Sequence, residues 1–169
     1  MRRSILAAGL ILITSLSYAQ ERPQHEIHAA MLYNFIKYIQ WPDEGTAGDF
    51  VVGVMGEDNV YKTLKEWYDG KPKGAKKYVI RQLSNPEEAA SCQVVYIGKT
   101  KSRNFDEVKA VTTGKPVLTI TDANGLGQKG SCINLKVVDG RLKFELNQGT
   151  VDASNLKVSS QLKSMAILI

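Results

Sequence analysis

Short apolar segments alternate with segments of helical spacing, and this alternation constrains the fold more than any other feature of the sequence. Strands are predicted at residues 50–55, 76–83, 92–98 and 116–121. Residues 50–55 are β-branched and almost continuously apolar, as in a strand covered on both faces, whereas residues 76–83 alternate. Helices are predicted before and between them at residues 25–40, 60–68, 85–91 and 101–113. Such alternation produces a mainly parallel sheet with right-handed crossovers.

The C-terminal part of the chain carries a different signal. Residues 132–138 and 141–147 form two further strand-like runs joined by Asp139-Gly140, a pair that strongly favours a tight hairpin. Residues 150–168 show a weaker helical pattern. The expected fold class is therefore α/β, a three-layer sandwich with a mixed, mainly parallel sheet and a C-terminal antiparallel hairpin at its edge.

The N-terminus resembles a targeting segment. Arg2 and Arg3 precede an uncharged apolar run over residues 5–16, and Ser17-Tyr18-Ala19 offers small residues for cleavage. The apolar run is shorter than the roughly 20 residues that a membrane-spanning helix needs, although an uncleaved anchor is the alternative. The sequence thus predicts a signal peptide at residues 1–19 and a single exported, periplasmic domain at residues 20–169.

Composition excludes several classes of protein. A hydrophobic fraction of 43% is too high for a disordered chain, and a net charge of +5 without one basic element does not indicate a nucleic-acid partner. Export would place Cys92 and Cys132 where a disulfide can persist. If their strands run in opposite directions, the two thiols lie at opposite ends of the sheet, so we expect no bridge between them.

No arrangement of residues in the sequence indicates catalysis. His25 and His28 have the spacing of a metal-binding pair, but no further ligands lie near them, and the first helix is expected to begin there in solvent. A nucleophile elbow of the G-x-S-x-G type is absent. The glycines at 125–130 lead into a strand and not into a helix, which argues against a dinucleotide site. No catalytic residue, metal or cofactor is predicted, and an exported hydrolase is the least favoured function.

The loops that follow three of the strands form the candidate ligand site. Ligands of open α/β sheets bind outside the carboxyl ends of the strands, where the strand order reverses. The loops there contain the candidate residues Gly56, Glu57, Asp58, Gly98, Thr100, Asp122 and Asn124. Ordinary turn and capping chemistry is the alternative explanation for them.

An ordered set of motifs resembles a known family. The opening stretch at residues 33–42 reads YNFIKYIQWP, and further matching pieces lie at residues 50–56, 92–98, 118–122, 130–135, 141–147 and 156–162. In this order they resemble the YfiR family. The signature positions are Asn34, Trp41, Pro42, Asn147 and Ser160. For all of these except Pro42 we expect a role in folding and not in partner contact.

The resemblance implies a regulator without enzymatic activity. The best-known members of the YfiR family are periplasmic repressors that bind the extracytoplasmic part of a membrane diguanylate cyclase, restrain cyclic-di-GMP synthesis and limit biofilm formation. The domain also occurs beside sensor kinases, so the implied partner is a membrane cyclase or a sensor kinase. Better-known members carry more cysteines than the two of this chain. A small-ligand-binding sensor is the alternative function, and a homodimer is left open.

Overall fold

An eight-stranded mixed sheet forms the centre of the molecule. The computed structural model describes residues 22–43 and 48–169, so the predicted signal peptide lies outside the described residues. The strand order is β10-β8-β7-β6-β5-β2-β4-β3. The bounds are β2 Gly48–Met55, β3 Pro72–Lys73, β4 Lys76–Gln82, β5 Val94–Ile97, β6 Leu118–Thr121, β7 Ile133–Val138, β8 Arg141–Leu146 and β10 Ile167–Leu168. Because β4, β2, β5, β6 and β7 pair in parallel, the predicted α/β sheet is confirmed.

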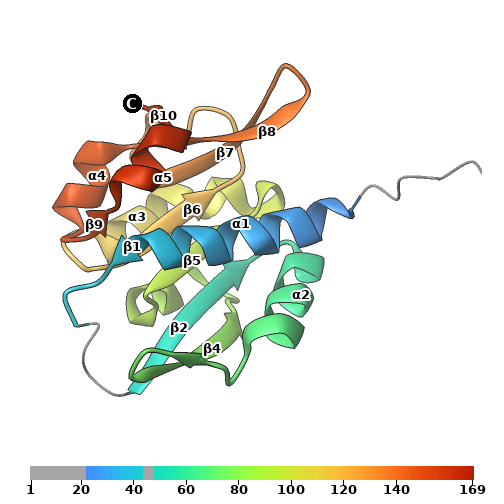
Figure 1. Cartoon of the computed structure of the whole chain (residues 1–169), viewed down its shortest axis with the longest axis vertical. Helices are drawn as coiled ribbons and strands as arrows, with labels where there is room; N and C mark the ends of the chain where they lie inside the picture. The colour runs from blue at the N-terminus through green and yellow to red at the C-terminus, as the bar shows by residue number, and fades with distance from the viewer. Residues whose placement is uncertain (1–21, 44–47) are drawn as a thin grey trace, which may run out of the picture.

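Helices cover both faces of this sheet (Figure 1). One face buries side chains of α1 (Gln24–Tyr38), α2 (Asp58–Tyr68), α4 (Gln148–Ala153) and α5 (Ser160–Met165) in one apolar core. The other face packs against the 3₁₀ helix η1 (Pro86–Ser91) and α3 (Phe105–Thr112), which follows η2 (Lys99–Asn104). The three-layer arrangement expected from the sequence is therefore confirmed.

The predicted hairpin is formed by β7 and β8. Asp139 and Gly140 both have positive φ, 50° and 71°, as the tight turn of a two-residue hairpin requires. The short strand β10 pairs in parallel with β8 and extends the sheet by one strand beyond the hairpin.

The weak helical pattern over residues 150–168 corresponds to two short helices and not to one continuous helix. The segment contains α4, the strand β9 (Lys157–Val158), α5 and β10. Asn155 has a left-handed backbone, φ 54°, which ends helical geometry after α4. The next residues then pair with β1 (Ile39–Gln40), and Ser159 caps α5 through a hydrogen bond from the amide of Leu162.

The two cysteines are free, so the prediction that they do not pair is confirmed, but the reason given for it is wrong. β5 and β7 run in the same direction, because each is parallel to β6. Cys92 and Cys132 therefore lie near the same edge of the sheet. They are separated because Cys92 belongs to the core on one face and Cys132 to the core on the other.

The strand order reverses between β2 and β5. The chain passes from β2 outward to β4, returns to the other side of β2 to form β5, and then continues through β6 to β7. In a doubly wound sheet the crevice for a ligand lies at this reversal, outside the carboxyl ends of the strands. The fold therefore places the loops after β2 and β5 at the position where a binding site is expected.

Candidate functional site

A pocket of about 310 Å³ opens at this reversal point. Its walls come from the start of α1, from the segment that leads into α2, and from the residues that follow β5 and β6. The lining residues are Gln24, His25, His28, Glu57, Asn59, Val60, Lys99 and Asp122. The pocket thus brings together two of the predicted residues, Glu57 and Asp122.

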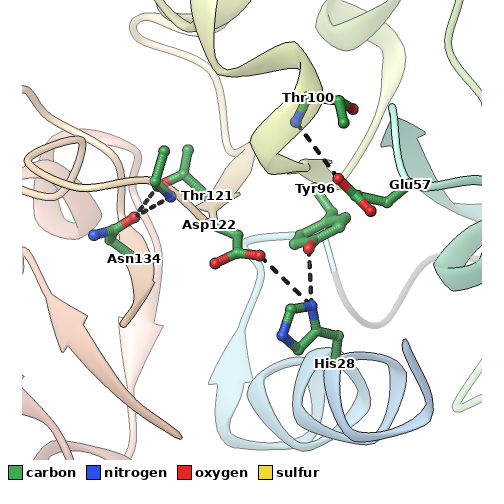
Figure 2. A network of polar contacts seen from close by, with 8 residues as sticks. His28, Glu57, Tyr96, Thr100, Thr121, Asp122 and Asn134 are labelled. Atoms are coloured by element: carbon green, nitrogen blue, oxygen red, sulfur yellow. Dashed lines mark hydrogen bonds and ion pairs between the residues drawn. The ribbon is translucent and has the colours of Figure 1, made fainter. Parts of the chain in front are cut away.

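Asp122 is held in place through its neighbours on both sides. The Thr121 hydroxyl donates to Oδ1 of Asn134 at 2.7 Å, and the Ala123 amide approaches the same oxygen at 3.4 Å. Asn134 is itself fixed, because its Nδ2 donates to Oε2 of Glu145 at 3.0 Å. Figure 2 shows how this anchoring leaves the Asp122 carboxylate facing His28.

His28 is buried, so the prediction of a solvent-exposed pair at the helix start is wrong for this residue. Its relative exposure is 4%, and Nδ1 lies 3.0 Å from the Tyr96 hydroxyl and 3.8 Å from Oδ2 of Asp122. Nε2 is the only buried side-chain nitrogen or oxygen in the described part of the chain that has no hydrogen-bond partner. The physical reason is the helix phase: His28 lies on the same face of α1 as the buried Leu32 and Phe35.

The two carboxylates set the electrostatics of the pocket. Burial lowers the pKa of His28, and the negative charges of Asp122 and Glu57 oppose that effect only in part. Burial raises the pKa of Tyr96, and the same two carboxylates raise it further. At neutral pH the imidazole and the phenol are therefore uncharged. Asp122 and Glu57 produce a negative electrostatic potential at both groups.

Glu57 fills the crevice between the loops after β2 and β5. It has a left-handed backbone, φ 53°, and its side chain does not cap α2. Instead it packs over Gly98, where a Cβ would overlap it, and its Oε1 lies 3.4 Å from the amide of Thr100. Gly56 is equally constrained, since a Cβ there would come within 2.6 Å of the Thr100 hydroxyl. Both glycines thus allow the two loops to approach closely.

The remaining predicted residues lie outside this pocket. Asp58 accepts a hydrogen bond from Nε2 of Gln82 at 2.7 Å. Thr100 and Asn124 line a neighbouring pocket of about 730 Å³, which shares Gln24, Lys99 and Asp122 with the first. From the sequence, His28 was expected in solvent and Tyr96 was not among the candidate residues. The helical stripe of α1 could have indicated His28, whereas Tyr96 lies in an apolar strand and gave no polar signal.

Two further features of the described residues concern metal ligands and helix length. Within residues 22–43 and 48–169, His, Cys, Asp and Glu form no group of three or more that could hold a metal ion. The helices of the same residues include none with the length and apolar character needed to cross a bilayer.

A sequence comparison decides the family. The model of the family described as YfiR/HmsC-like matches residues 25–167, which include every element of the sheet up to β10. The chain belongs to the YfiR/HmsC-like family. The resemblance stated from the motifs is thereby confirmed, and YfiR/HmsC-like proteins are generally regulators without enzymatic activity.

The YfiR/HmsC-like signature positions differ in their surroundings. Trp41 is 4% exposed and its Nε1 donates to the carbonyls of Gln93 and Pro116. Asn147 caps α4, accepting from the amide of Thr150 at 2.9 Å. Both surroundings support the expected role in folding.

Asn34, Pro42 and Ser160 are exposed. The side chain of Asn34 makes no hydrogen bond within the described residues, and the cap of α5 is Ser159, the neighbour of Ser160. A folding role for Asn34 and Ser160 therefore has no support from their contacts.

Proposed function

We propose that this protein is an exported regulator that binds a membrane signalling protein, a diguanylate cyclase or a sensor kinase, on its extracytoplasmic side. Through that contact it restrains cyclic-di-GMP synthesis and biofilm formation. The observation that carries the proposal is the match to the YfiR/HmsC-like family over residues 25–167, which spans the whole sheet and is not confined to one motif.

The pocket chemistry supports a binding protein more than a hydrolase. A catalytic histidine passes a proton to or from a nucleophile through a hydrogen bond. Among the described residues, Nδ1 of His28 contacts only Tyr96 and Asp122, and Nε2 has no partner. His28 is therefore paired with groups that orient it, without a serine or cysteine to activate.

Affinity capture tests this function. The full chain of 169 residues, carrying a C-terminal tag, is expressed in its own host, membranes are solubilised, and the tagged protein is captured with its partners. We expect a membrane protein with an extracytoplasmic domain and a cyclase or kinase output to be enriched over a tagged, unrelated periplasmic protein. Equal recovery of such proteins by both baits would contradict the proposal.

We also propose that the pocket at the strand ends is a small-ligand site, so that the regulator can respond to a molecule outside the cytoplasm. The specific observation that favours this second role is the buried, incompletely paired His28 in a pocket at the strand-order reversal. A thermal-shift screen of amino acids, nucleotides and vitamins tests it. A hit is expected to disappear in Asp122→Asn, and the absence of any hit, or hits that Asp122→Asn leaves intact, would contradict the role.

A further inference from the structure

We propose that the pocket between α1, α2 and the carboxyl ends of β5 and β6 binds the ammonium group of a small aliphatic amine. This inference rests on the proposed ligand site and names the chemistry that the site would accept. It does not depend on which membrane protein is the partner.

Two carboxylates with few partners face the pocket. Asp122 has a side-chain exposure of 23%, and its contacts are a hydrogen bond with the Tyr96 hydroxyl and a 3.8 Å approach to Nδ1 of the uncharged His28. Glu57 has one hydrogen bond there, the long 3.4 Å contact from the Thr100 amide. Partly buried carboxylates are costly unless a cation or several donors compensate them, so an incoming cation would be stabilised.

The walls of the pocket add to this preference. His28 and Tyr96 are the uncharged groups next to Asp122, and burial disfavours a charge on either of them. The imidazole therefore does not compensate the charge of the carboxylates at neutral pH, and Lys99 is the one lysine or arginine that lines the pocket. An ammonium group carries three donors and matches carboxylate oxygens as acceptors.

The pocket has the size of a short alkylamine. A volume of about 310 Å³ corresponds to roughly ten water-sized groups at about 30 Å³ each. A four-carbon diamine has six non-hydrogen atoms and would occupy such a space with a few waters.

The ammonium group of Lys99 would compete with the ammonium group of the ligand for Asp122 and Glu57. Lys99 lines both pockets, and its ammonium group has no ion-pair partner among the described residues. Its flexible stem can bring the charge toward Asp122 or Glu57 when no ligand is bound. Removal of this charge should therefore strengthen the binding of an amine, whereas it should weaken the binding of an anion.

Three probes with the same four-carbon chain test the proposal by isothermal titration calorimetry at pH 7.5 and low salt. They are 1,4-diaminobutane, the neutral butane-1,4-diol and the anionic succinate. We expect measurable binding of the diamine only. Its affinity should fall at least tenfold in Asp122→Asn and in Glu57→Gln, and should rise in Lys99→Gln.

Asp49→Asn is the matched control, because Asp49 is an exposed aspartate at the opposite end of β2 and should leave the affinity unchanged. Circular dichroism of each variant without probe establishes that it is folded. If Asp122→Asn does not fold, the affinity of Glu57→Gln for the diamine tests the proposal. No binding of the diamine, or an equal loss in Asp49→Asn, would overturn the proposal. Binding of the diol or of succinate that Asp122→Asn abolishes would overturn the amine class while supporting the ligand site itself.

Discussion

His28 lies between influences that favour opposite protonation states. Burial at 4% exposure favours the neutral imidazole, whereas Asp122 and Glu57 favour the charged form. Burial is the larger effect and lowers the pKa of His28 in the folded protein. In the unfolded chain the residue returns to its usual value of 6.5, so the unfolded state binds more protons in mildly acidic solution.

Stability should therefore decrease as the pH falls from 7.5 to 5.5. The contribution of His28 is fully present above pH 6.5 and is lost as the pH falls through the lowered folded value, with a slope of at most about 1.4 kcal/mol per pH unit. Urea unfolding at several pH values measures it, and His28→Gln should flatten the dependence while His25→Gln should not. The same slope in wild type and His28→Gln would contradict the assignment.

This pH window is separate from that of the carboxylates. The pKa values of Asp69 and Glu145 are lowered, Asp69 chiefly by the hydrogen bond from the Ile80 amide and Glu145 by its bonds to Lys136 and Asn134, which outweigh its burial. Their contributions are present above the usual values of 3.8 and 4.5 and are lost only in more acidic solution. Measurements above pH 5.5 therefore report mainly on His28.

The thiols provide a second prediction at this scale. Cys92 and Cys132 are 3% and 0% exposed, and burial raises the pKa of Cys92 to about 11 and also raises that of Cys132. Both should react with Ellman's reagent only after unfolding, without prior reduction, and a reductant should leave the melting temperature unchanged. Fewer than two reactive thiols in denaturant without reductant would reveal a disulfide and contradict the structure.

At the scale of elements, short helices depend on their caps. Ser159 accepts the hydrogen bond from the Leu162 amide at the start of α5, while the adjacent Ser160 is exposed and has no such contact. Ser159→Ala should lower the free energy of unfolding by about 1 kcal/mol, whereas Ser160→Ala should change it by less than about 0.5 kcal/mol. Chemical denaturation of the two variants measures this difference, and equal effects would show that the cap is assigned to the wrong serine.

The elements also show what the sequence could and could not predict. The parallel strands and the Asp139-Gly140 hairpin were predictable because continuous apolar runs and turn residues are local signals. The C-terminal segment was not, because six-residue helices and two-residue strands carry too little periodicity and depend on pairing with β1 and β8.

The candidate site divides in the same way. Glu57 and Asp122 were predictable because loops at the carboxyl ends of parallel strands meet at one edge. His28 was expected in solvent because it stands at the start of the first helix, whereas its place on the face of Leu32 and Phe35 buries it. Tyr96 could be predicted as a pocket residue only with knowledge of which helix lies across β5, and the sequence does not show that tertiary contact.

At the scale of the whole molecule, the reversal of the strand order determines where the pocket lies, and the family match covers the sheet from β2 into β10. In the proposed function the protein acts through its surface, and the proposed ligand site would let that surface respond to a small molecule. Loss of the protein should therefore release its partner from repression. In a strain without the partner, loss of the regulator should have no further effect.

The most direct test of this regulatory role is the cellular cyclic-di-GMP concentration in three strains. One lacks the regulator, one lacks the captured membrane partner, and one lacks both. If the partner is a cyclase, we predict a rise of cyclic-di-GMP in the first strain that disappears in the third. An unchanged concentration without the regulator, or a rise that persists without the partner, would contradict the account.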